Sequence, residues 1–71
     1  MDSTYPNLYR ELNKANISLF LLAQELNISE DVADGKLRGE IPWLLTEAVG
    51  ICRMLNTSDI NFLFLRLDNN S

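Results

Sequence analysis

The chain has 71 residues, of which 46% are hydrophobic and 23% are charged, and its formal net charge is −4. This length allows one small domain, near the lower size limit at which a hydrophobic core alone supports a fold, and the composition is that of a globular protein. A sequence pI of about 4.5 disfavours strong nonspecific DNA binding, which depends on Lys and Arg, although a local basic patch can still attract a duplex.

Several classes of protein are excluded by what the sequence lacks. It has one cysteine and no histidine, so neither a disulfide framework nor a Cys/His zinc site is expected. Without a Gly-rich phosphate loop or metal-ligand spacing, we expect no enzymatic activity, catalytic residue, metal or cofactor. The amino terminus does not pair a basic segment with an apolar core, and the longest apolar run, at 19–23, is too short to span a bilayer. These features predict a soluble, cytoplasmic protein with no membrane partner.

The first predicted helix covers about residues 6–15. Pro6 suits the first turn of a helix, where its missing N–H is not needed. Leu8, Leu12 and Ala15 recur at helical spacing and predict the buried face of this segment.

Three Asn-x-Ser triplets, at 16–18, 27–29 and 56–58, separate the apolar segments. Each matches the glycosylation acceptor pattern, but in a chain without an export signal the capping interpretation is favoured. Asn tolerates the left-handed conformation that ends one helix, and Ser at the next N-cap accepts a hydrogen bond from the following first turn. The triplets therefore predict two short helices, at 19–26 and 30–38, joined by a tight turn.

The fourth predicted helix, at 43–55, has the clearest amphipathic pattern. Its apolar stripe comprises Leu45, Ala48, Val49, Cys52 and Leu55. A cysteine on this stripe indicates a buried thiol rather than a nucleophile. Trp43 is expected to fill the preceding loop against the core, and Gly39 can supply the positive φ that ends the third helix.

The fifth predicted helix covers 59–65, with Asp59 favourably placed near the helix dipole. The run FLFLRL at 62–67 satisfies strand alternation as well as the end of a helix. If it is helical, Phe62 and Leu65 face away from the apolar stripe of the segment. This excess apolar surface either packs against the first helix or lies between the subunits of a homodimer.

Two short helices joined by a tight turn in a five-helix chain resemble the lambda-repressor/Cro-like helix-turn-helix family, often called XRE, and particularly its small phage- and prophage-associated members. Ala23 occupies the place of the small residue that lets the third helix approach the second, and Asn27 replaces the usual Gly of the turn. KLRGEIPW at 36–43 is similar to the family's K-L-x-G segment, and TEAVGICRMLNTSDINFLF at 46–64 to the helix and closing turn that follow. Other residues in register are Leu22, Leu26, Ile28, Lys36, Leu37, Gly39, Glu47, Ala48, Ile51, Leu55 and Ser58.

The resemblance implies an all-α, five-helix lambda-repressor-like DNA-binding domain with a helix-turn-helix, occupying residues 1–71. It also implies a small phage- or prophage-type transcriptional regulator that binds operator DNA as a dimer, with the helix at 30–38 in the major groove. The residues that it places toward double-stranded DNA are Ser29, Glu30, Asp31, Asp34, Lys36 and Arg38. Lys36 and Arg38, with Arg53, are the cations best placed to flank that groove.

The composition of the third helix leaves alternatives open. Glu30 and Asp31 can interact with the helix dipole, accept a hydrogen bond from cytosine N4, or repel DNA and meet a basic protein. Gly35, also expected on the exposed side, weakens a helix by about 1 kcal/mol relative to alanine. Leu19 stands where a typical member has a phosphate-binding Gln, and with Phe20 it forms an apolar patch unless the core absorbs Phe20.

These positions define a second hypothesis from a different class. The chain would be a protein-interaction module on a helix-turn-helix frame, such as an antirepressor or a regulator of a repressor, that does not bind DNA itself. Its apolar contact residues would be Leu19, Phe20, Phe62 and Leu65, with the carboxylates Glu30, Asp31 and Asp34 beside them. A steep loss of affinity with salt would indicate phosphate contact, whereas a tight, weakly salt-dependent protein complex would support the second hypothesis.

Overall fold

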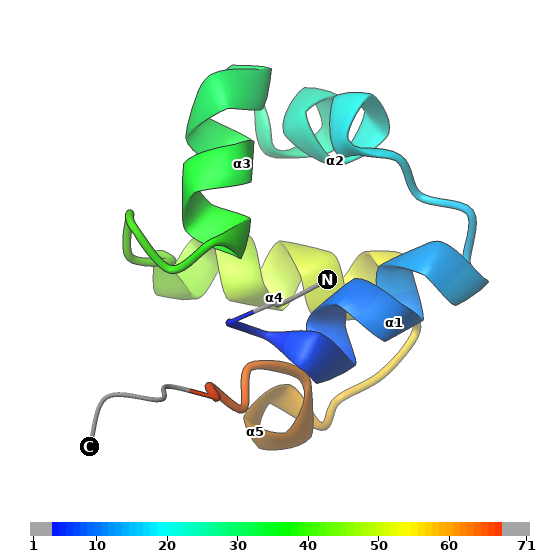
Figure 1. The fold of residues 1–71 in the computed structure, drawn as a ribbon. Helices are drawn as coiled ribbons and strands as arrows, with labels where there is room; N and C mark the ends of the chain where they lie inside the picture. Colours follow the sequence, from blue (N-terminus) through cyan, green and yellow to red (C-terminus); the bar gives the residue numbers. More distant parts are fainter. Residues whose placement is uncertain (1–3, 68–71) are drawn as a thin grey trace.

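The computed structural model describes residues 4–67, which contain five α-helices and no β-strand (Figure 1). In chain order the helices are α1 Pro6–Lys14, α2 Leu19–Leu26, α3 Glu30–Leu37, α4 Leu45–Met54 and α5 Ile60–Leu63. The all-α prediction is confirmed for this part of the chain. In Figure 1, α2 and α3 lie on one side of α1 and α4, and α5 lies on the other side.

The start of α4 lies two residues beyond residue 43, where the apolar pattern places it. Leu44 has extended backbone angles, with φ −81° and ψ 150°, and its N–H donates to Glu47 Oε1 at 3.0 Å. A carboxylate at the third helical position that accepts from the N-cap N–H fixes a helix start at that point. Pro42 disfavours a helical conformation of Ile41, so the end of α3 is not continued into α4.

α5 is shorter than the predicted segment 59–65. Asp59 is its N-cap rather than a residue of its first turn, since Asp59 Oδ1 accepts from the Phe62 N–H at 3.2 Å. Beyond the helix, the Leu67 N–H donates to the Thr4 carbonyl at 2.8 Å. The second half of the ambiguous run is therefore neither helix nor strand, and it returns to the beginning of the described chain.

The three triplet asparagines each end a helix, as the capping interpretation predicts. Asn16, Asn27 and Asn56 have positive φ angles of 59°, 59° and 56°. In each case the N–H groups of the Asn and of the next residue donate to carbonyls in the last helical turn, at 2.9 to 3.2 Å. These paired bonds satisfy carbonyls that the end of a helix would otherwise leave without partners.

Two of the three triplet serines begin the next helix. Ser18 Oγ caps α2 by accepting from the Leu21 N–H, and Ser29 Oγ caps α3 by accepting from the Val32 N–H, both at 3.1 Å. The third triplet differs, because Asp59 caps α5 in place of Ser58. A carboxylate one residue later offers a stronger acceptor at the positive end of the helix.

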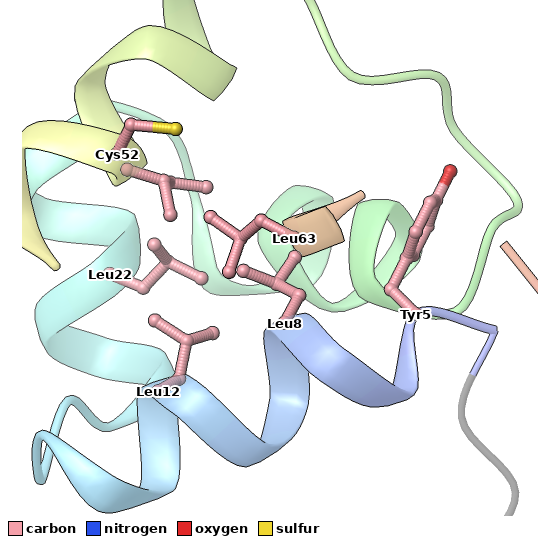
Figure 2. Close-up of a cluster of buried hydrophobic side chains, with 7 residues drawn as sticks. Tyr5, Leu8, Leu12, Leu22, Cys52 and Leu63 are labelled. Atoms are coloured by element: carbon pink, nitrogen blue, oxygen red, sulfur yellow. The ribbon is translucent and has the colours of Figure 1, made fainter. Parts of the chain in front are cut away.

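A single hydrophobic core joins α1, α2, α4 and α5 (Figure 2). Leu8, Leu22, Ile51 and Leu63, one from each of these helices, are fully buried. The complete buried cluster comprises Tyr5, Leu8, Leu12, Leu22, Ile51, Cys52 and Leu63. Full burial of a Leu or Ile side chain contributes about 1.5 to 3 kcal/mol, so this cluster is the main apolar source of stability.

α3 contributes little to that cluster and is held in other ways. It packs against α2, and the carbonyls of Arg38 and Gly39, just after the helix, accept from Thr4 Oγ1 at 2.9 Å and from Arg66 Nη2 at 3.2 Å. Gly39 has a φ of 80°, and a Cβ there would lie 2.8 Å from Thr4 Cγ2. Thr4 and Arg66, near the two ends of the described residues, therefore hold the carboxyl end of α3, at a position that requires glycine.

Candidate functional site

The candidate site is the unit formed by α2, the turn at 27–29 and α3, which we call the α2–α3 unit. The two helices pack against each other (Figure 1), and Ala23 of α2 and Ala33 of α3 are both buried. Alanine side chains allow the helix backbones to approach closely. The outer face of α3, defined by Glu30, Asp31, Asp34, Arg38 and Glu40, is then left at the surface.

The outer face of α3 is predominantly acidic. Glu30 and Asp31 are exposed in the first turn, where the helix dipole stabilises negative charge. Ser29, which precedes them, uses its hydroxyl to cap the helix. The single cation of this face, Arg38, lies 3.0 Å from Asp34 and 3.4 Å from the Glu40 carboxylate. This face therefore carries four carboxylates and one guanidinium, which is paired with two of them.

Lys36 lies on the inner side of α3 and is only 4% exposed. Its Nζ lies 2.8 Å from Glu47 Oε1, donates to the Pro42 carbonyl at 2.9 Å and lies 5.7 Å from the centre of the Trp43 ring. The expectation that Lys36 flanks a DNA groove as a surface cation is therefore wrong. A buried ammonium needs a paired carboxylate, and here the pairing joins α3 to the start of α4.

The same contact governs the ionisation of Glu47. Burial by itself raises the pKa of this carboxyl, but the hydrogen bond and charge of Lys36, with the Leu44 N–H, outweigh burial and hold the pKa below its ordinary value. Glu47 is therefore an ionised carboxylate in the folded chain at neutral pH. It serves both as a helix cap and as a counterion.

Gly35 also differs from its expected place on the exposed side of α3. It is buried, and a Cβ there would lie 2.7 Å from Ile41 Cδ1. The Gly35 carbonyl accepts from the N–H groups of Glu40 and Ile41, at 2.9 and 3.2 Å. Glycine thus allows the loop after α3 to fold back onto the helix, which accounts for its presence inside a helix.

Leu19 and Phe20 have different environments at the start of α2. Phe20 is 61% exposed, so the core does not absorb it. Leu19 is partly buried and lines a hollow of about 230 Å³ between α1, α2 and the last turn of α3, which we call the α1–α2–α3 hollow. Tyr9 and Leu37 line the same hollow. The first position of α2 is therefore apolar and borders this hollow.

Phe62 and Leu65 remain at the surface, 46% and 54% exposed, so packing against α1 does not bury them. A groove of about 560 Å³ lies between the start of α4 and α5, and Leu44 and Leu45, both exposed, line it. At its base the Trp43 ring meets Phe64 edge-on, with centroids 5.6 Å apart, as expected for a residue that fills the loop against the core. The groove and the two exposed residues make the surroundings of α5 a second apolar surface.

A reactive thiol, a metal site and a membrane-spanning helix each place requirements on the described residues. Cys52 is buried, and burial, with the nearby Asp59 charge, raises the pKa of its thiol, which disfavours the reactive thiolate. Within residues 4–67, no three His, Cys, Asp or Glu side chains are grouped closely enough to hold a metal ion. None of the described helices has the length and apolar character needed to cross a membrane.

Glu47 and the exposed pair Leu44 and Leu45 are the residues that sequence reasoning missed. Glu47 was identified only as a residue in register with a family pattern. Its carboxylate three residues after Leu44 is the spacing of a capping box, but a hydrophobic residue at the N-cap hides that signal. The apolar pattern places Leu45 on the buried stripe of this helix, but Leu45 is 73% exposed, so that prediction is wrong, and Glu47 is buried instead.

No protein-family model, curated protein or solved structure matches this chain. The functional argument therefore depends on the geometry and charge of the α2–α3 unit.

Proposed function

We propose that this chain is a regulatory protein that binds another protein through the α2–α3 unit, on a helix-turn-helix frame, and does not bind DNA through α3. The observation that carries this proposal is the charge of the outer face of α3. Its carboxylates are exposed, its cation Arg38 is paired, and Lys36 is buried. An antirepressor or a regulator of a repressor is the role that this combination supports.

Electrostatics favour the protein partner over a duplex. DNA affinity comes largely from Lys and Arg side chains that neutralise phosphates and release counterions. A face with four carboxylates and one paired guanidinium repels the phosphate backbone instead, and a net charge of −4 does not compensate for it. At the first position of α2, the Leu19 side chain cannot hydrogen-bond to a phosphate.

A transcriptional regulator that binds operator DNA as a dimer is the second candidate. The observation that favours it is the α2–α3 unit itself, with two short capped helices joined by a three-residue turn. Asp31 or Asp34 could accept a hydrogen bond from cytosine N4 in the major groove. Joining two half-sites in a dimer would raise the affinity of a weakly binding domain, and the exposed Phe62 and Leu65 offer a contact between subunits.

Fluorescence anisotropy separates the two candidates. The purified protein is titrated into a labelled random-sequence duplex and into the DNA upstream of its own gene, at low salt and near physiological salt. We expect no binding to either duplex under either condition. Specific, salt-sensitive binding to the upstream DNA would reject the proposal in favour of the second candidate. In that event Arg38→Glu should weaken binding, and Arg10→Glu, the same charge change at an exposed position of α1, is the matched control.

A further inference from the structure

The α1–α2–α3 hollow is the place where the α2–α3 unit can accept a side chain from outside. Its wall is formed by Tyr9 and Asn13 of α1, Leu19 of α2 and Leu37 at the end of α3. Its volume of about 230 Å³ is sufficient for one large apolar side chain. Phe20, the next residue of α2, is exposed and adds apolar surface to the unit.

The charges beside this hollow come mainly from α3. Residues at i, i+4 and i+7 share one face of a helix, so Glu30, Asp34 and Leu37 form a single row. The row runs from the hollow at Leu37 to Asp34, whose ion pair with Arg38 stays in solvent, and then to Glu30 in the first turn. Across the hollow, two α1 cations follow lining residues directly: Lys14 is paired with Glu11 at 3.6 Å, and the Arg10 guanidinium donates to Asn7 Oδ1 at 3.2 Å.

We infer that the hollow receives an apolar side chain from a basic segment of a partner protein, whose cations lie against Glu30 and Asp34. The inference deepens the proposed function and rests on it, because it specifies the chemistry of the protein partner. An apolar anchor in a pocket with flanking charged contacts is the usual arrangement of a small interface. Charge complementarity supplies orientation and a faster association rate.

Two other occupants fit this site less well. A second copy of the chain would bring the same acidic row toward the first, and like charges facing each other across an interface are unfavourable. A phosphate would meet Leu19, Leu37 and Tyr9 at the hollow and carboxylates along α3. A cationic segment with one large apolar residue complements both parts of the surface.

The test uses the isotope-labelled 71-residue protein and a synthetic amphipathic peptide of Leu and Lys, with a peptide of the same pattern in Leu and Glu as the control. Binding is followed by NMR. We expect the Lys peptide to bind and the Glu peptide not to bind. The amide shifts should cluster at Tyr9, Leu19 and Leu37. Failure of the Lys peptide to bind, or shifts confined to the groove between α4 and α5, would overturn the inference.

Two apolar variants test the anchor. Leu19→Asp should weaken binding of the Lys peptide at least about tenfold, because it places a charge in the hollow. Since Leu19 is partly buried, far-UV circular dichroism must show that this variant still folds. Phe20→Ser, at an exposed position, is the milder variant and should weaken binding about threefold if α2 contributes to the contact. An unchanged affinity in both folded variants would contradict the proposed anchor.

A matched pair of charge variants tests the acidic row. Glu30→Gln and Glu25→Gln each remove one exposed carboxylate, the first from the acidic row and the second from α2, without breaking the Lys14–Glu11 or Arg38–Asp34 pair. Glu30→Gln should weaken peptide binding several-fold more than Glu25→Gln. Equal effects would show that net charge alone attracts the peptide, and would reject the inferred contact.

These outcomes separate the inference from the proposed function. Duplex binding in the anisotropy experiment would defeat the proposed function whatever the peptide does. Absence of both duplex and peptide binding would defeat only the inference, since a protein partner could then contact another part of the α2–α3 unit.

Discussion

On the inner side of α3 the Lys36 ammonium lies 2.8 Å from a Glu47 carboxylate oxygen and is shielded from water. On the outer side the Arg38 guanidinium lies 3.0 Å from Asp34 and stays in solvent. The side chains of the inner pair are 5% and 10% exposed, and those of the outer pair 59% and 46%. The two ion pairs thus have similar lengths but opposite environments.

Burial decides what each pair contributes. An exposed ion pair is screened by water and contributes about 0 to 1 kcal/mol. A buried pair need not stabilise the folded state more than apolar residues of similar size would. Removal of one partner, however, leaves the other charge buried without a counterion, which is strongly destabilising. The inner pair therefore fixes the position of α3 on α4. The outer pair leaves its face of α3 available to a ligand.

The largest expected effect is that of Glu47→Ala. It leaves the Lys36 ammonium buried without its carboxylate and removes the acceptor of the Leu44 N–H. We expect a loss of about 3 to 5 kcal/mol in the free energy of unfolding, measured by urea denaturation. A domain of this size has a total stability of only about 5 kcal/mol, so this variant should be partly unfolded without denaturant.

Two controls test whether burial is the cause. Asp34→Ala breaks the exposed pair with Arg38 and should cost no more than about 1 kcal/mol. Lys36→Met combined with Glu47→Leu replaces both buried charges by apolar side chains and should recover most of the loss. If Asp34→Ala were as damaging as Glu47→Ala, the contrast between the two sides of α3 would be wrong.

A smaller effect is expected from Gly35→Ala, also on the inner side. The new methyl group would lie 2.7 Å from Ile41 Cδ1, so the loop must shift, and overpacking of this kind typically costs about 1 to 3 kcal/mol. The gain in helix propensity, about 1 kcal/mol, offsets part of this cost. We expect a net loss of about 1 kcal/mol in the free energy of unfolding.

The matched control for this substitution is Gly50→Ala in α4. A Cβ there would lie 3.5 Å from Leu26 Cδ2, an ordinary van der Waals contact, so the helix should gain up to about 1 kcal/mol. Ile41→Val removes the atom that collides with the new methyl group at Gly35, and should restore stability to the Gly35→Ala variant. Equal effects of alanine at the two glycines would show that the loop after α3 does not restrict the inner side.

The helices were predictable because the signals that set them are local. Asn16, Asn27 and Asn56 end helices through their own backbone conformation, and Ser18 and Ser29 cap the next turns. Apolar spacing identified only part of each buried face: Leu8, Leu12, Ala48 and Cys52 are buried as predicted. The same prediction is wrong for Ala15, Leu45 and Val49, which are exposed, because Ala15 lies at the C-cap of α1 and Leu45 at the first residue of α4. Where a local signal was weak, as at the hydrophobic N-cap before α4, the predicted boundary moved by two residues.

The side of α3 on which each charge lies was not predictable in the same way. Lys36 and Arg38 are close neighbours in the sequence, yet one is buried and the other exposed. The difference depends on Glu47, which comes from another helix, and on a loop that can fold over α3 only because residue 35 is glycine. Contacts of this kind arise from tertiary packing, so they cannot be predicted from the residue pattern of a single helix.

The smallest expected effect is a change in the pH dependence of stability. Burial raises the pKa of Glu47, but Lys36 and the Leu44 N–H lower it below its ordinary value of 4.5. A carboxyl whose pKa is lower in the folded than in the unfolded chain stabilises the fold above its ordinary pKa, and this contribution is lost as the pH falls through the folded pKa. Stability should therefore decline from pH 4.5 downward.

Glu47→Gln keeps the shape of the side chain but cannot ionise. Urea denaturation at several pH values should therefore show a weaker dependence of its stability on pH in that range. Comparison of the variant with the unmodified chain isolates this carboxyl from the others. If the two profiles had the same slope below pH 4.5, Glu47 would not be the ionised partner of Lys36, and the inner side of α3 would be held by apolar contacts alone.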